Sequence, residues 1–131
     1  MPYQADYVMR LIEQLSGVIR AMKDRLSGGK PQAAEKTDEA ATQAISLVLG
    51  VDPLVGSRLS PDTLAMMLRL GDVHPDVLPL LAEALELDVQ ALEAEGRTGE
   101  ADARRAQAAA VRSAFAIPRG RPTAARSFPP R

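Results

Sequence analysis

Apolar residues in the first part of the chain recur at intervals of three and four, and no other feature of the sequence constrains the fold as strongly. They occupy positions Val8, Leu11, Ile12, Leu15, Val18, Ile19, Met22 and Leu26. Side chains at these intervals share one face of an α-helix, whereas strict alternation would indicate a strand. The pattern predicts one amphipathic helix of about 23 residues and about 35 Å, closed by Gly28 and Gly29.

Glycine and proline divide the next part of the chain. A second helix is expected over about 31–49, ending at Gly50, and it should pair with the first as an antiparallel hairpin. The segment 51–59 holds a proline and a glycine and is expected to be a loop. Ser60 is a strong N-cap residue and Pro61 suits a first turn, so a third, short helix should follow.

Two more helices are expected before the C-terminal residues. The fourth begins near Asp76, because Pro79 is tolerated in the first turn of a helix and would clash deeper inside one. It runs to Gly96. Thr98 should then cap a fifth helix that ends before Pro118. Large apolar residues are sparse in this fifth helix, and its many alanines predict close packing against its neighbours.

The composition agrees with an all-helical protein. Of the 131 residues, 46% are hydrophobic but only 3% are aromatic. The core must therefore consist of aliphatic side chains and alanine, which suits closely packed helices. We predict the all-α class, with about five helices packed as antiparallel hairpins in one domain over residues 1–117. Residues 118–131 are rich in proline and arginine, and we expect them to form a C-terminal tail.

Charge is segregated along the chain, although the net charge is only −1. Residues 1–71 are neutral in sum, residues 72–102 carry −8, and residues 103–131 carry +7 from arginines alone. One interpretation is that an acidic and a basic helix attract each other in an antiparallel hairpin. The other is that the arginines form a basic arm for nucleic acid. The first is favoured, because the adjacent acidic segment would repel phosphate.

The residue types that most catalytic and metal centres need are scarce. The chain has no cysteine and one histidine, His74, so a thiolate nucleophile and a cysteine-ligated metal are excluded. Acid–base work by His74 would need partners that the sequence does not indicate, and a turn or capping role is favoured. The acidic helix also lacks the Glu-x-x-His pattern of carboxylate metal bundles. We predict no catalytic residue, no metal and no cofactor.

Segment 7–15, Tyr-Val-Met-Arg-Leu-Ile-Glu-Gln-Leu, resembles the opening of a family of small bacterial proteins of unknown function. The likeness continues through segment 59–64 and the last helix pair, and it covers residues 5–115. The resemblance implies a helical, tetratricopeptide-like fold and no established activity. However, Arg105 stands where the repeat usually has a bulky apolar residue, and no second copy follows. A peptide-binding superhelix, which needs several stacked repeats, is therefore not expected.

The apolar stripe of the first helix is the most informative surface, because its spacing approximates the heptads of a coiled coil. The residues that we assign to a dimer or partner interface are Val8, Leu11, Leu15, Val18 and Met22. One interpretation is that the stripe covers other helices of the same chain. The other is a two-fold seam between two copies, since so long a helix outreaches shorter partners. Met66 and Met67 likewise either fill the core or form an adaptable binding surface.

We therefore expect a non-enzymatic protein-interaction module that binds a protein partner or itself as a homodimer. The alternative is a nucleic-acid-associated protein, and its contacts would be Arg104, Arg105, Arg112, Arg119, Arg121 and Arg126. No feature indicates a small-molecule ligand. The first residues lack the cationic start and apolar run of a signal peptide, and no stretch has the roughly 18–20 apolar residues of a bilayer span. We expect no membrane association and a cytoplasmic location.

Overall fold

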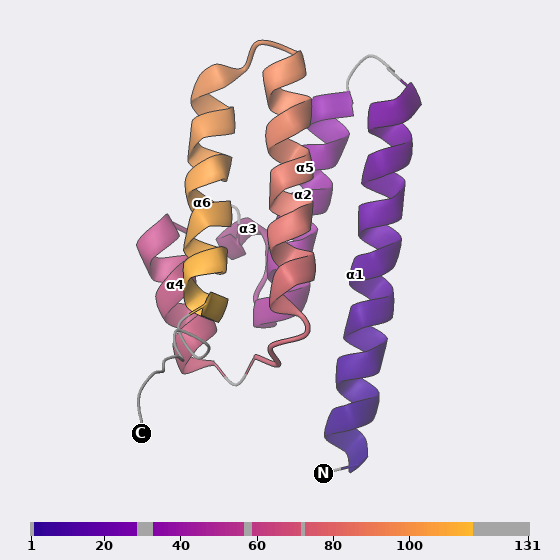
Figure 1. Ribbon diagram of the computed structural model, residues 1–131, viewed down its shortest axis with the longest axis vertical. Coiled ribbons are helices and arrows are strands. Elements are labelled where there is room, and N and C mark those ends of the chain that lie inside the picture. Colours follow the sequence, from indigo (N-terminus) through magenta and orange to yellow (C-terminus); the bar gives the residue numbers. More distant parts are fainter. Residues whose placement is uncertain (1, 29–32, 57–58, 72, 117–131) are drawn as a thin grey trace, which may run out of the picture.

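The computed structural model describes residues 2–28, 33–56, 59–71 and 73–116, and Figure 1 shows their arrangement. Within these residues the chain forms six helices and no strand, which confirms the all-α class. The helices are α1 (Pro2–Gly28), α2 (Ala33–Leu49), α3 (Pro53–Gly56), α4 (Pro61–Leu70), α5 (Leu78–Ala94) and α6 (Thr98–Ala116). The tail predicted over residues 118–131 lies outside the described residues.

Helix α5 lies at the centre of the molecule. It packs against α6, α2 and α1, while α4 packs against α6. As predicted, α1 and α2 form one antiparallel hairpin and α5 and α6 form another (Figure 1). The composition of α5 explains its position, because ten of its 17 residues are buried, whereas Glu83, Glu86 and Glu93 share one partly exposed face. A tetratricopeptide-like stacking of the two hairpins stays a prediction.

Aliphatic side chains and alanines build the core, as the composition indicates. Among the largest fully buried side chains are Leu15, Met22, Ile45, Leu81 and Leu85. The contribution of α6 is different, because three of the four buried apolar residues that the structure describes in it are alanines. Ala101, Ala108, Val111 and Ala114 are buried there. Small side chains let two helix axes come close, so the alanine-rich α6 can pack tightly on α5.

The predicted start of α4 is confirmed. The glycine that ends α4 has a different backbone conformation from the glycines that end α2 and α5. The Ser60 hydroxyl accepts a hydrogen bond from the backbone N–H of Thr63 at 3.1 Å, which caps the helix. Gly50 and Gly96 follow their helices with φ of 70° and 74°, the left-handed region that favours glycine. Gly71 instead has φ −76°. A Cβ there would lie 2.8 Å from the carbonyl oxygen of Met67, so lack of space favours glycine at this position.

Two helices differ from expectation. The predicted loop over 51–59 contains the short helix α3, because Asp52 accepts a hydrogen bond from the backbone N–H of Leu54 at 2.8 Å and so starts a turn. Helix α1 begins at Pro2 and has 27 residues, whereas α2 has 17. At 1.5 Å per residue, the ten extra residues add about 15 Å. The N-terminal end of α1 therefore projects past the loop between α4 and α5 (Figure 1).

Candidate functional site

The apolar stripe of α1 lies against the rest of the chain along most of its length. Leu11, Leu15 and Met22 are buried, and Val8 and Val18 pack half-buried against the same core. Of the two interpretations of the stripe, coverage by helices of the same chain therefore holds for the three buried residues. A dimer seam through Leu11, Leu15 and Met22 is wrong, because the core of their own chain already encloses them.

An apolar groove opens where α1 extends past its neighbours. We call it the α1–α4 groove, because the first turns of α1 and the second half of α4 line it together with the end of α2 and the loop before α5. Its volume is about 1050 Å³. Its large apolar side chains include Val8, Met9, Ile12, Met66, Met67 and Leu70. The groove thus begins where the buried part of the α1 stripe ends.

Four large apolar side chains around this groove face the solvent. The exposed fractions are 55% for Tyr7, 64% for Met9, 53% for Met66 and 80% for Leu70. Single exposed apolar residues are ordinary on a protein surface, but a contiguous set marks an interaction surface. These four residues all line the same groove, and they therefore form a candidate binding surface.

Helix α4 supplies one wall of the groove because it carries apolar side chains on two faces. Leu64 and Leu68 are buried in the core. Met66 lies two positions after Leu64, and Leu70 lies two positions after Leu68. Two positions correspond to about 200° around the helix, and both Met66 and Leu70 are exposed. A surface helix normally has one apolar face. Of the two roles weighed for the methionines, core filling therefore fails for Met66, which lies on the second face.

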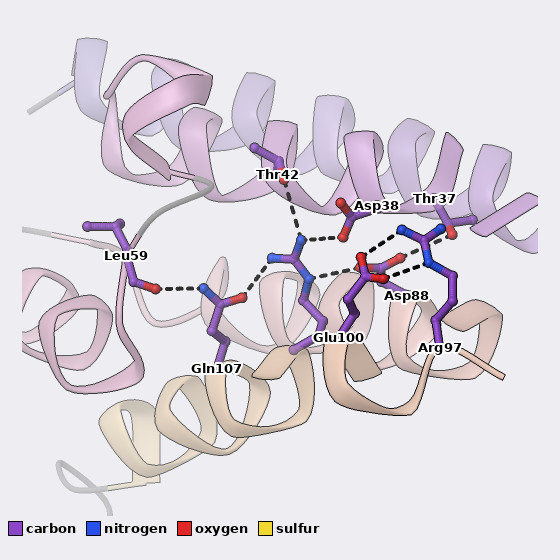
Figure 2. A network of polar contacts seen from close by, with 9 residues as sticks. Thr37, Asp38, Thr42, Leu59, Asp88, Arg97, Glu100 and Gln107 are labelled. Atoms are coloured by element: carbon purple, nitrogen blue, oxygen red, sulfur yellow. Dashed lines mark hydrogen bonds and ion pairs between the residues drawn. The ribbon is translucent and has the colours of Figure 1, made fainter. Parts of the chain in front are cut away.

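A buried polar cluster between α2, α5 and α6 is the second candidate site, and we call it the Arg104 network (Figure 2). Arg104 is only 8% exposed. Its Nε donates a hydrogen bond to Asp88 Oδ2 at 2.8 Å, and its Nη2 donates to Asp38 Oδ1 at 2.6 Å. Its Nη1 donates to Gln107 Oε1 at 2.7 Å. One guanidinium therefore joins three helices through charge-assisted hydrogen bonds.

Two further hydrogen bonds extend the network to its surroundings. The Thr37 hydroxyl donates to Asp88 Oδ1 at 3.1 Å, so Asp88 is held from both α2 and α6. The Gln107 amide donates to the backbone carbonyl of Leu59 at 2.9 Å, which ties α6 to the segment before α4 (Figure 2). The network thus connects elements far apart in the sequence.

The two carboxyl groups of the network differ in acidity. Burial, followed by hydrogen bonding with Asp38, raises the pKa of Asp88 to about 7, because a fully enclosed carboxyl is more stable when neutral. Burial acts in the same direction on Asp38, but its hydrogen bonds with Asp88 and Arg104 outweigh burial and lower its pKa. Below about pH 7 the pair therefore holds one proton, on Asp88, while the charge of Asp38 balances Arg104.

The position of this network favours a structural role over a chemical one. Two carboxyl groups that share a proton can perform acid–base chemistry if a substrate reaches them. However, neither the α1–α4 groove nor a smaller hollow between α1 and α2 is lined by Asp38 or Asp88. Among the described residues, no group of three or more ligating side chains is placed to hold a metal ion. The network fastens helices together.

The arginines proposed as nucleic-acid contacts are engaged with acidic residues wherever the structure describes them. Assigning Arg104 to nucleic acid is wrong, because it is buried between the carboxyl groups of Asp38 and Asp88. Arg105 pairs with Glu93 and Asp102, and Arg112 pairs with Glu86 at 2.6 Å. Arg119, Arg121 and Arg126 lie outside the described residues. Because Arg104, Arg105 and Arg112 all reach acids of α5, the attraction predicted between an acidic and a basic helix is confirmed.

The single histidine has the turn role that the sequence favours. His74 Nδ1 accepts a hydrogen bond from the backbone N–H of Asp76 at 3.1 Å, and the ring is exposed at the edge of the α1–α4 groove. The nearest Asp76 carboxylate oxygen is 3.8 Å from Nδ1. This arrangement shapes the loop that leads into α5.

Comparison with family models, curated proteins and solved structures found no match. The resemblance to a family of small bacterial helical proteins therefore stays a prediction. Within the described part of the chain, no helix combines the length and apolar character needed to cross a membrane. The functional argument rests on the two sites themselves.

Proposed function

We propose that this protein is a non-enzymatic protein-interaction module, and that its binding surface is the α1–α4 groove. The observation that supports the proposal most directly is the set of exposed apolar side chains, Tyr7, Met9, Met66 and Leu70, around one groove of about 1050 Å³. Grooves of this kind accept the apolar face of an amphipathic helix. Methionines suit such a surface, because their flexible side chains adapt to the partner.

A protein segment fits the groove better than a small molecule. Small-molecule pockets typically enclose about 300–1,000 Å³ and combine apolar walls with a few convergent polar groups. The α1–α4 groove, at about 1050 Å³, lies at the upper end of this range, so the polar groups decide between the two. Among the described residues, its titratable side chains are Tyr7 on α1 and His74 and Asp76 in the loop before α5, all exposed. The groove therefore offers area for apolar contact and little to orient a small ligand.

The exposed side chains set the scale of the binding that we expect. Covering Tyr7, Met9, Met66 and Leu70 contributes about 1–2 kcal/mol for each side chain, given that each is already partly buried. The total is comparable with the lower part of the about 4–15 kcal/mol that association costs. Additional contacts from the rest of the groove are needed for a stable complex. An affinity in the micromolar range, which corresponds to about −8 kcal/mol, would come from those additional contacts.

Nucleic-acid binding receives no support from the described residues. Arg104 is buried, and Arg105 and Arg112 are paired with acids of the same chain. A phosphate backbone would have to displace these intramolecular partners. The interaction module is therefore the function that we retain.

Site-specific photocrosslinking tests the proposal. A photoreactive residue replacing Met66 should form protein adducts, and the added substitution Leu70→Glu should abolish them by placing a charge in the groove. The matched control carries the photoreactive residue at Leu54 of α3, which is as exposed as Met9 but does not line the groove. Adducts of equal yield at Leu54 and Met66, or none at Met66, would count against the proposal.

A further inference from the structure

We infer that the occupant of the α1–α4 groove is a second copy of this chain. In this arrangement the N-terminal end of α1 from each copy lies in the groove of the other, between α1 and α4. The inference rests on the proposed function, because it names the partner of the same binding surface. In the dimer, the α1 helix of each copy would cover the open side of the groove of the other copy.

The shape of the molecule supports this arrangement. Helix α1 has 27 residues and its hairpin partner α2 has 17, so its first turn extends past α2, while Val8 in the second turn packs on the core. Ala5, Val8, Met9 and Ile12 have the spacing of one helix face, and all four line the groove. A projecting helix end beside a groove on the same surface is self-complementary. This is the property that a two-fold interface between identical chains requires.

The opposite wall matches the same helix face. Met66, Met67 and Leu70 of α4 line the groove at positions i, i+1 and i+4, and Met66 and Leu70 are exposed. Among the described residues, Met66, Met67 and Leu70 do not belong to the hydrophobic core that includes Leu64 and Leu68. A second α1 would bring its uncharged apolar face to this wall by the helix-in-groove mode of recognition.

Charge favours a second copy over the arginine-rich end of the same chain. The α1 face that lines the groove carries no charge over Ala5, Val8, Met9 and Ile12. Of the described residues that line the groove, Asp76 is the one carboxylate. Residues 118–131 contain four arginines and no acid, so they would leave most of their charges without a partner there. An apolar helix face is the better match.

Sedimentation velocity of the full chain over a range of concentrations tests the inference. The chain should form a dimer at micromolar concentrations. Met9→Glu and Leu70→Glu should each weaken dimerisation by about tenfold or more, because each would bury a charge in an apolar groove. Leu54→Glu is the control, since Leu54 is exposed outside the groove, and it should leave dimerisation unchanged. Thermal melts should show that all three variants fold, because the three side chains are exposed.

A mixing experiment then tests which surfaces meet. In the proposed dimer, Met9 of one copy lies near Leu70 of the other, so a chain with Met9→Glu should pair with a chain carrying Leu70→Lys. The mixture should dimerise more tightly than either variant does alone. If both variants dimerise like the wild type, or if mixing restores nothing, the proposed arrangement is overturned. A dimer that forms only after residues 118–131 are removed would assign the groove to the tail and overturn it as well.

The result also separates this inference from the proposed function. A monomeric full chain that still gives adducts through Met66 would overturn the second copy as occupant and leave the interaction module standing. A monomeric chain without adducts would overturn both. A dimer that is lost with Leu70→Glu and kept with Leu54→Glu would support both.

Discussion

The Arg104 network and the α1–α4 groove treat their side chains differently. The network buries charged side chains and pairs them within the chain, whereas the groove leaves apolar side chains exposed to water. In the network, a buried guanidinium and the fully buried carboxyl of Asp88 find hydrogen-bonding partners within the chain. In the groove, apolar side chains such as Met9 and Leu70 remain in water. Burying an unpaired charge is far more costly than exposing an apolar side chain. The folded chain therefore satisfies its buried charges by itself and leaves the apolar surface for another molecule to cover.

Removing the central cation should have the largest effect on stability. Arg104→Ala would leave the carboxyl groups of Asp38 and Asp88 without their cation and should lower the free energy of unfolding by about 3–5 kcal/mol. Arg105→Ala is the control on the next residue, since the Arg105 side chain is half exposed, and it should cost less than about 1 kcal/mol. Urea unfolding measures both. Equal losses for the two variants would show that the network stabilises no more than a surface ion pair.

Two leucines of α4 test the same contrast for apolar side chains. Leu68 is buried and Leu70 is 80% exposed. Leu68→Ala should cost about 2–5 kcal/mol, because it leaves a cavity in the core. Leu70→Ala should change the stability of the monomer by no more than about 0.5 kcal/mol. The measurement is made in a chain that also carries Met9→Glu, because a lost dimer contact would otherwise add to the change. A large loss for Leu70→Ala in that background would mean that this side chain serves the fold rather than a partner.

The network should make the folded state less stable as the pH rises. The pKa of Asp88 is about 7 in the folded protein and its ordinary value is 3.8. The folded state therefore binds the extra proton between these values, and its stabilising contribution is complete below about pH 4 and lost as the pH rises through about 7. Asp38 acts in the opposite direction, since its lowered pKa contributes stability that is lost in acid. We expect a net loss of roughly 2–4 kcal/mol between about pH 4 and pH 8.

Asp88→Asn is the variant that isolates this effect. Asparagine resembles the protonated carboxyl and cannot ionise, so unfolding free energies in urea should vary much less between about pH 5 and pH 8. The charged groups that act on Asp88 are Asp38 from α2 and Arg104 from α6, and both stay in place. If the variant keeps the pH dependence of the wild type, another group is responsible for it.

Most of the helices could be predicted from local sequence. The stripe of α1, the Ser60 cap and the glycines after α2 and α5 act over a few residues, so their spacing is enough to identify them. The turn at α3 was the exception, because its cap, Asp52, lies in a segment whose proline and glycine suggest a loop. Pairing of α5 with α6 was also predictable, since it follows from charge that is segregated along the chain.

Neither site could be located in this way. The Arg104 network joins residues 66 positions apart, Asp38 and Arg104, and no local pattern distinguishes Arg104 from Arg105. The groove depends on how far α1 extends past α2, and therefore on where both helices end. One signal was present in α4, because Met66 and Leu70 lie on the side opposite its core residues. A second apolar face on a short helix can be recognised in the sequence, and here it indicates one wall of the groove.

A small loss of unfolding free energy is expected for a third arginine of α6, Arg112. The comparison with Arg104 shows that the surroundings of an arginine, rather than the residue type, set the strength of its ion pair. Arg112 makes two hydrogen bonds of 2.6 Å to Glu86 across the α5–α6 pair, a shorter and more symmetrical contact than that of Arg104 with Asp88. By geometry alone, Arg112 would be the stronger interaction. Both partners are nearly half exposed, however, so water and salt screen their attraction. Arg112→Ala should cost about 0.2–1 kcal/mol in urea unfolding, and the loss should shrink when salt is added, whereas the loss for Arg104→Ala should persist. If the two losses respond equally to salt, burial does not separate the network from the surface pairs.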